Sequence, residues 1–299
     1  MLQLQLDTVK AYSLAMEQSR ISLLRRLVVE NKGAEPYEQL SLEISLLPDL
    51  GESQHLELPT LHGGDSFDAT DHPVPMPIGL LAQEIEDRAI EIRCRVLQGG
   101  ETILQEARSL RLLAYNTLRW PRSQNGDAAE AYACFVTPNH PVIAVVLKRT
   151  SQTLERLGVN NSLDGYQSGP GRVVELVRAL YLTLGELGIS YINPPAGYWS
   201  AGQRIRLPDQ VLNEGLGTCA DLTPLAASCL EQIGLYPVLV GLKGHALPGV
   251  FLSAEAAAQQ GALLEEVSTV QQLIDAKELL IFDSSTYVAS PQPSFEEAV

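Results

Sequence analysis

The sequence predicts an α+β protein of two domains, and three observations support this prediction. The chain has 299 residues, which is enough for two domains of ordinary size. Hydrophobic residues make up 45% of it and charged residues 19%, a balance typical of globular rather than disordered proteins. Apolar residues alternate with polar ones up to about residue 113, whereas their spacing is helical from about residue 127. We therefore predict one domain over 1–113 and a second over 114–299.

The first domain, 1–113, is predicted to be a β sandwich with an N-terminal extension. Period-two alternation and turn signals such as Asn31-Lys32-Gly33 begin at about residue 20. Several short strands separated by such turns are typical of an antiparallel sandwich, and an immunoglobulin-like arrangement is expected. Pro75 to Leu81 is expected to be a connection into a short helix. The segments with the strongest strand character are 21–30, 40–46 and 89–97.

The second domain, 114–299, is predicted to begin with helices and to continue as an α+β domain. Pro141 suits the first turn of a helix, and Ile143, Val146, Leu147 and Leu154 repeat at helical spacing after it. Further helices are expected over 128–135, 172–187 and 208–215.

A cysteine, a histidine and an aspartate follow one another in this domain, each beside a predicted element. Cys219 lies in the first turn of a helix expected over 219–233, His245 opens a strand, and Asp283 ends the strand expected over 278–282. A helix N-terminus and a nearby imidazolium both favour the thiolate form of a cysteine. An aspartate can fix the tautomer and orientation of the imidazole. The order therefore predicts a cysteine-nucleophile triad.

Each of these residues also has an ordinary structural interpretation. A cysteine at the start of a helix is usually structural, and an isolated histidine or aspartate often belongs to a turn. Only the combination of the three favours catalysis. Cys229 lies on the apolar stripe of the same helix, so we expect it to be a core residue. The stretch 254–276, between the histidine and the aspartate, is expected to be helical and to lie over one edge of the sheet.

Composition excludes several classes of function. A formal net charge of −15 argues against direct binding of nucleic acid, which needs basic surface. The four cysteines form no short pair, so neither a disulfide framework nor a zinc site is expected, and a cytoplasmic location is the simplest. No stretch approaches the length of a membrane span, and no phosphate-binding loop occurs. We expect no cofactor, no metal and no membrane association.

The motif Gly217-Thr218-Cys219-Ala220-Asp221-Leu222, together with Gly244-His245-Ala246 and Phe282-Asp283, resembles the transglutaminase-like fold of the papain-like cysteine superfamily. The resemblance covers about 190–290. It implies that Cys219 is the nucleophile, that His245 is the base and acid, and that Asp283 orients the histidine. The backbone N–H of Cys219 is the natural first donor to an oxyanion, and Gln203 is a candidate second donor. Leu247-Pro248-Gly249 departs from the aromatic residue that often follows the histidine, and the interval to Asp283 is longer than usual.

Four further segments are similar to the N-terminal region of very large bacterial helicase proteins that are associated with phage defence. That likeness implies an accessory module. A helix that starts at Ser294 suggests either a fragment of a longer protein or a C-terminal tail that is not packed down. The segments are 135–141, 164–167, 192–195 and 202–208.

We therefore expect a cysteine peptidase or acyl-transfer enzyme that acts on a protein substrate, in a setting of bacterial antiphage defence. The sequence leaves hydrolysis and acyl transfer open. The alternative is a catalytically silent protein-binding or sensing module of a larger defence assembly, with a partner domain in place of a substrate.

Overall fold

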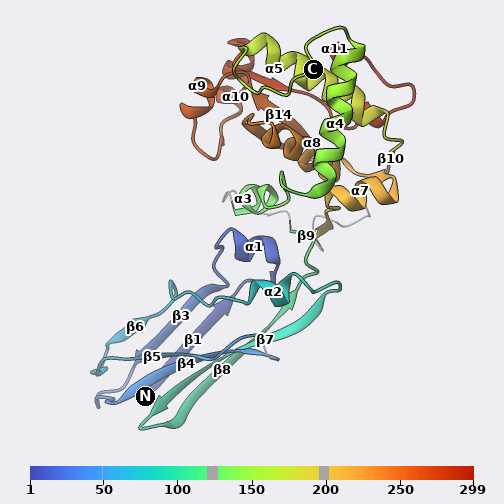
Figure 1. Cartoon of the computed structure of the whole chain (residues 1–299). Helices are drawn as coiled ribbons and strands as arrows, with labels where there is room; N and C mark the ends of the chain where they lie inside the picture. Colours follow the sequence, from blue (N-terminus) through green and yellow to red (C-terminus); the bar gives the residue numbers. More distant parts are fainter. Residues whose placement is uncertain (49, 120–126, 195–201) are drawn as a thin grey trace. The chain divides into compact units, whose positions relative to one another are not determined.

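The computed structural model describes residues 1–48, 50–119, 127–194 and 202–299 (Figure 1). The chain divides into two compact units, unit 1 (Met1–Thr117) and unit 2 (Leu118–Val299). Helices and several sheets are both present, which confirms the predicted mixed α+β class.

The division lies after residue 117 rather than at the predicted 113. The backbone explains this difference, because the chain stays bound to unit 1 after the last long strand ends at Leu112. The N–H of Leu113 donates to the carbonyl of Tyr12 (2.9 Å), and the N–H of Tyr115 donates to the carbonyl of Glu84 (2.7 Å). The short strand β9 (Thr117–Leu118) spans the boundary.

Unit 1 contains two sheets. The first has three antiparallel strands in the order β1-β3-β6, and the second has five strands in the order β2-β8-β7-β4-β5. Two short helices, α1 (Leu14–Gln18) and α2 (Ile78–Leu81), lie between strands, and α2 matches the helix expected after Pro75. The strands are β1 (Leu2–Thr8), β2 (Ala11–Tyr12), β3 (Leu24–Asn31), β4 (Leu40–Leu47), β5 (Gln54–Glu57), β6 (Ser66–Asp68), β7 (Arg88–Gln98) and β8 (Glu101–Leu112).

The N-terminal residues form a strand, which corrects the expectation of an extension before the sandwich. Strand β1 pairs with β3 from Leu2 opposite Asn31 to Thr8 opposite Leu24. Leu2, Leu4 and Leu6 alternate with polar residues and are buried. This is the period-two pattern of a half-buried strand, and it begins at the second residue of the chain.

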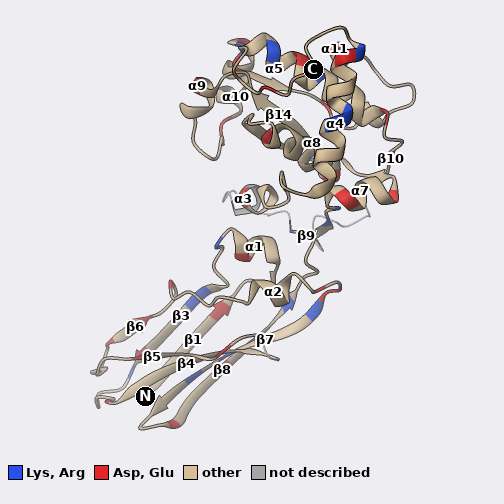
Figure 2. Ribbon diagram, viewed as in Figure 1, with Lys and Arg blue, Asp and Glu red and all other residues tan. Residues whose placement is uncertain are grey.

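The two sheets of unit 1 share one hydrophobic core. Leu27 of β3, Leu42 of β4 and Ile92 of β7 are fully buried in the same cluster. Charged residues occupy the other positions of several strands, and Figure 2 shows blue and red residues interspersed along them. Arg95 pairs with Glu43 across neighbouring strands, so at least this basic side chain is neutralised.

Unit 2 contains a helical core around α8 (Cys219–Gln232). Helices α4, α5, α7 and α8 lie within three residues of the predicted boundaries, and their apolar faces, with Ile143, Val177 and Leu225, meet in one buried cluster. Apart from α8, the described helices and short strands of unit 2 are α3 (Asp127–Ala133), α4 (Pro141–Arg156), α5 (Pro170–Gly185), β10 (Ser190–Tyr191), β11 (Gln203–Arg204), α7 (Pro208–Glu214), β12 (Leu216–Gly217), α9 (Ala254–Ala258), α10 (Val267–Asp275), η1 (Thr286–Val288) and α11 (Phe295–Ala298).

A three-stranded antiparallel sheet packs against α8 (Figure 1). Its strands, in the order β13-β14-β15, are β13 (Pro237–Leu242), β14 (His245–Phe251) and β15 (Leu279–Ile281). The strand that opens at His245 and the strand before Asp283 were expected, although β15 is shorter than the predicted 278–282. The expected helical stretch 254–276 is two helices, α9 and α10, joined by non-helical chain. Leu273 of α10 packs with Phe251 and Leu279 of the sheet.

Among the helices of the described residues, none combines the length and the apolar character that crossing a bilayer would require.

Candidate functional site

Cys219 is the first residue of α8 and follows the N-cap residue Thr218. This is the position that the sequence predicted. Its side chain is nearly buried, with 6% exposed. The first backbone N–H groups of a helix have no partner within the helix and favour negative charge beside them. The fold therefore places the thiol at the N-terminus of α8.

A buried carboxylate, Asp221, holds the start of α8 in place. It is fully buried and accepts hydrogen bonds from the N–H of Thr218 (2.8 Å), the N–H of Arg206 (2.7 Å) and Nη1 of Arg206 (3.2 Å). Burial raises the pKa of Asp221, and these hydrogen bonds act in the opposite direction. The network fixes the backbone immediately before Cys219.

Pro224, one turn into α8, leaves the backbone carbonyl of Ala220 without a donor within the helix, and the hydroxyl of Tyr132 donates to it instead. Proline has no N–H, so it donates nothing to the carbonyl four residues earlier, which belongs to Ala220. The hydroxyl of Tyr132 in α3 donates to that carbonyl at 3.0 Å. Both Tyr132 and Ala220 are buried. This hydrogen bond thus replaces the helical hydrogen bond that Pro224 cannot make, at the residue after Cys219.

We expect Tyr132→Phe to lower the free energy of unfolding by about 1–3 kcal/mol, because the Ala220 carbonyl loses its hydroxyl donor in a buried position. Urea-induced unfolding followed by far-ultraviolet circular dichroism measures this change. Tyr236→Phe is the matched control, because Tyr236 is 54% exposed. Equal stability of the two variants would contradict this role of Tyr132.

His245 and Asp283 form a hydrogen-bonded pair. The distance between His245 Nε2 and Asp283 Oδ1 is 3.1 Å. The same carboxylate oxygen accepts hydrogen bonds from the N–H (2.8 Å) and the hydroxyl (2.7 Å) of Ser285, so its position is fixed independently of the histidine. Because Nε2 faces the aspartate, Nδ1 is the ring nitrogen left to take a proton from a nucleophile.

Direct contacts join the cysteine helix to the segment that carries Asp283. The hydroxyls of Thr223, in α8, and Ser284 are 3.3 Å apart. The hydroxyl of Tyr287 donates to the carbonyl of Leu222 at 3.0 Å. Since α8 also packs against β14, which begins at His245, the fold gathers the three predicted residues in one region of unit 2.

Gln203, the candidate second oxyanion donor, is buried and lies beside the start of α8. Its Nε2 donates to Oγ1 of Thr218 at 3.2 Å. The side chain is thus tied to the residue before Cys219.

Two residues around Cys219, Asp221 and Tyr132, were not found from the sequence. For Asp221 the pattern Thr218-x-x-Asp221 was a usable signal, because a threonine followed by an acidic residue three positions later is typical of a helix start. Tyr132 lies far from Cys219 along the chain, and no spacing rule links the two residues.

Two of the other cysteines, Cys94 and Cys229, belong to the hydrophobic cores of the two units. Cys94 and Cys229 are fully buried, and burial raises the pKa of each thiol to about 12. This agrees with the core role expected of Cys229. A search of the described residues finds no group of three or more His, Cys, Asp or Glu side chains able to hold a metal ion.

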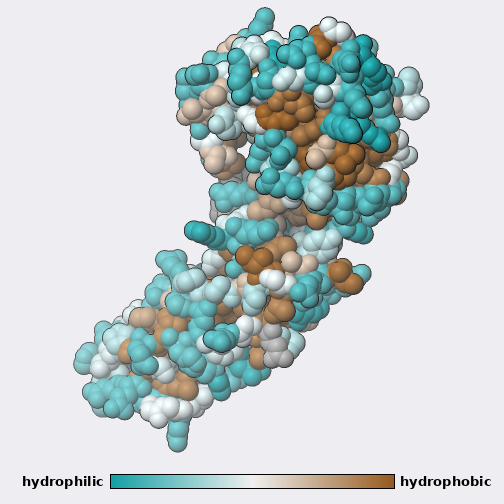
Figure 3. All heavy atoms as spheres, viewed as in Figure 1, coloured by the Kyte–Doolittle hydropathy of each residue, from teal (hydrophilic) through white to brown (hydrophobic). Residues whose placement is uncertain are grey.

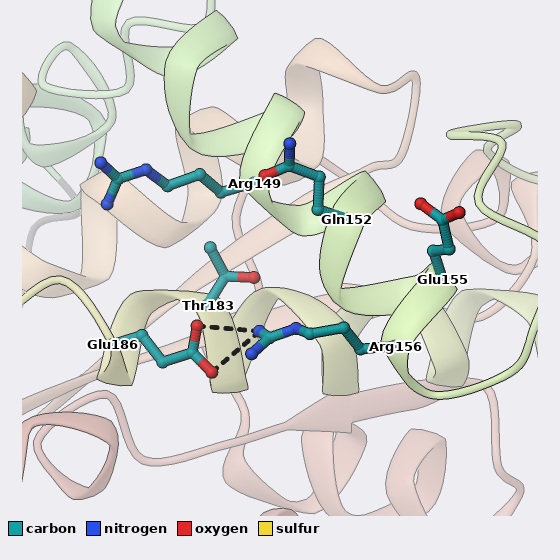
Figure 4. Close-up of a pocket in the computed structure, with 6 residues that line it drawn as sticks. All are labelled: Arg149, Gln152, Glu155, Arg156, Thr183 and Glu186. Carbon is teal, nitrogen blue, oxygen red and sulfur yellow. Dashed lines mark hydrogen bonds and ion pairs between the residues drawn. The ribbon is translucent and has the colours of Figure 1, made fainter.

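An open cavity of about 580 Å³ lies between α4 and α5 (Figure 4). An ion pair between Arg156 and Glu186 (2.8 Å) occupies part of it. The cavity is lined by Arg149, Gln152, Glu155, Arg156, Thr183 and Glu186, and thus by neither a cysteine nor a histidine.

No protein-family model matches the chain, and neither a curated protein nor a solved structure is similar to it.

Proposed function

We propose that unit 2 is a transglutaminase-like cysteine enzyme that hydrolyses or transfers acyl groups of a protein substrate. The observation that carries this proposal is the 3.1 Å pair of His245 and Asp283 on the elements that pack against the start of the Cys219 helix. A nucleophile at a helix N-terminus and a base oriented by a third group are the parts that nucleophilic catalysis requires.

Cys219, His245 and Asp283 take part in the proposed reaction. His245 takes the thiol proton of Cys219 at Nδ1, and the sulfur attacks the substrate carbonyl carbon. The tetrahedral intermediate collapses to a thioester as the leaving amine receives that proton from His245. Water or a substrate amine then resolves the thioester. Asp283 keeps the imidazole oriented throughout.

The setting of the reaction rests on the sequence motifs alone. We propose that unit 1 is an immunoglobulin-like sandwich that positions a substrate or partner domain, and that the protein works in the bacterial cytoplasm in antiphage defence. Gln203 remains a candidate second oxyanion donor in this scheme.

A second candidate function is a catalytically silent binding or sensing module. The 6% exposure of Cys219 favours it, because little of the thiol is open to a substrate. Tyr236, immediately before β13, and Leu242, its last residue, are 54% and 50% exposed and offer apolar contact area. Figure 3 also shows hydrophobic patches among hydrophilic residues on the viewed face of unit 2. Exposed apolar surface of this kind suits a protein partner.

Modification of Cys219 by a thiol reagent distinguishes the two functions. We expect methyl methanethiosulfonate to modify Cys219 about 100-fold faster in the wild-type chain than in His245→Ala, because the variant lacks the proposed base. Peptide mapping by mass spectrometry gives the rate at each cysteine separately.

Cys134, which is partly exposed, is the internal control and should react equally in both chains. Equal rates of modification at Cys219 in the wild type and in His245→Ala would contradict the proposed enzyme and favour the binding or sensing module.

A further inference from the structure

Tyr181, in α5, packs against the segment that carries Asp283. Its side chain is fully buried. Its ring meets the ring of Phe282 edge-on, with the ring centroids 6.5 Å apart, and that of Tyr287 in the same way at 6.0 Å. Phe282 comes directly before Asp283 in the chain, and Tyr287 follows four residues after it. Helix α5 therefore supports the chain on both sides of the aspartate.

The hydroxyl of Tyr181 links two further segments. It lies 2.9 Å from the carbonyl oxygen of Pro293 and 3.1 Å from Oγ1 of Thr286. The hydroxyl of Thr286 in turn donates to the carbonyl of Asp283 at 2.6 Å. Because Thr286 uses its own proton in that bond, the proton of the phenol is shared between Thr286 and Pro293. The Tyr181 hydroxyl thus joins the Asp283 loop to the chain that leads into α11.

Helix α11 holds the other side of the Asp283 backbone. The N–H of Asp283 donates to the carbonyl of Ala298 at 2.9 Å. Phe295 and Ala298 are buried, and the Phe295 ring meets that of Tyr181 with centroids 5.8 Å apart. Helix α11 lies beside α5 (Figure 1), which corrects the alternative of a C-terminal tail that is not packed down. The N–H and the carbonyl of Asp283 are therefore both bound by groups that Tyr181 supports.

The position of this backbone decides where the carboxylate meets His245. Oδ1 of Asp283 is 3.1 Å from Nε2 of His245 and also accepts from the N–H and hydroxyl of Ser285. Ser285 belongs to the same loop as Asp283, so it would move with the aspartate. Tyr181 belongs to α5 and holds the loop from outside.

We propose that Tyr181 is a positioning residue of the candidate triad, whose hydroxyl holds the Asp283 loop so that the carboxylate stays within hydrogen-bonding distance of His245. This proposal rests on the proposed acyl-transfer function. Tyr181 is fully buried, so it contacts no substrate and exchanges no proton in the reaction. It acts through Asp283.

Tyr181→Phe keeps the ring and removes only the hydroxyl. In the full chain, we expect acetylation of Cys219 by p-nitrophenyl acetate to slow about tenfold, because a displaced aspartate orients the base less well. Peptide mapping by mass spectrometry measures the rate, and circular dichroism shows that the variant is folded. The matched control is Tyr166→Phe, which should react as the wild type does. The Tyr166 hydroxyl also joins two backbone groups, donating to the carbonyl of Phe251 and accepting from the N–H of Tyr236, both at 2.9 Å.

The same substitution in Asp283→Ala separates positioning from a general loss of packing. If Tyr181 acts through Asp283, then Tyr181→Phe should change the rate of Asp283→Ala by less than about twofold. An equal loss of rate with and without Asp283 would contradict the positioning role, since a packing defect acts in both chains.

Failure of the proposed function gives a different result. If Asp283→Ala and His245→Ala are both acetylated at Cys219 as fast as the wild type, the proposed function fails, and the role of Tyr181 fails with it. If both are slow while Tyr181→Phe reacts as fast as the wild type, only the positioning role is wrong.

A second pair of variants covers the case in which Tyr181→Phe does not fold. Thr286→Val has nearly the size of threonine but lacks the hydroxyl between Tyr181 and Asp283, so acetylation of Cys219 should again slow about tenfold. Thr286→Ser keeps a hydroxyl and should restore the rate. A wild-type rate in Thr286→Val, or a Thr286→Ser chain as slow as Thr286→Val, would overturn the proposal.

Discussion

Replacing Cys219 by alanine is expected to reduce acyl transfer by about a millionfold, to the rate of the uncatalysed reaction, since nothing else in the site replaces the attacking sulfur. The substitution removes one nearly buried sulfur at the end of a helix and leaves the Asp221 network intact. Folding should therefore be retained. Release of p-nitrophenolate from p-nitrophenyl acetate measures the loss, and circular dichroism reports the fold.

Cys229→Ala is the matched control for this variant. Cys229 lies on the same helix, is fully buried and packs in the core of unit 2. Its truncation should lower stability by about 1 kcal/mol and leave the rate per folded molecule unchanged. Equal losses of rate in Cys219→Ala and Cys229→Ala would show that the helix matters only as a packing element.

Asp221→Ala is expected to lower the free energy of unfolding by about 3 kcal/mol, because it leaves the buried N–H of Thr218 and the partly buried N–H of Arg206 without an acceptor. The start of α8 would lose its fixed position, so acylation should fall by about 100-fold even under conditions in which the chain is folded. Urea-induced unfolding and the acylation rate measure the two effects.

Glu214→Ala tests whether the loss of any carboxylate beside Arg206 has the same effect. Glu214 accepts from Nε of Arg206 at 2.6 Å, but its side chain is 36% exposed. A pair of this kind is worth less than about 1 kcal/mol. A variant Glu214→Ala as unstable as Asp221→Ala would contradict the special role of the buried carboxylate.

The elements of unit 2 were predictable because their signals are local. Pro141 at the start of α4, Gly215 after α7 and the apolar stripe of α8 each mark a boundary within a few residues. The same signals placed Cys219, His245 and Asp283 at the start of a helix, the start of a strand and just past the end of a strand. Their proximity followed only from the order of the elements.

The parts that could not be predicted depend on contacts between distant segments. Tyr132 donates to the carbonyl of Ala220, 88 positions away in the sequence, and Tyr191 pairs with Gly217 through a strand of two residues. A two-residue strand has no periodicity to detect. Strand β1 is different, because the alternation of Leu2, Leu4 and Leu6 with polar residues is a local signal that the sequence carries.

Cys219 is nearly buried, and hydrogen bonds from neighbouring residues fix the position of the candidate site. Asp221 fixes the backbone before the thiol, Tyr132 completes the helix after it, and Ser285 holds Asp283 toward His245. Groups held in place in this way reorganise little during a reaction, which is the condition under which fixed donors and bases are effective.

The measurement that tests the proposed triad most directly is the mass of the protein during its first turnover with p-nitrophenyl acetate. We expect one acetyl group on Cys219 of the wild-type chain, located by peptide mapping, and no acetyl group at this position in His245→Ala over the same time. A wild-type chain that carries no acetyl group on Cys219, or a His245→Ala chain acetylated there just as fast, would contradict acyl transfer by Cys219 and His245.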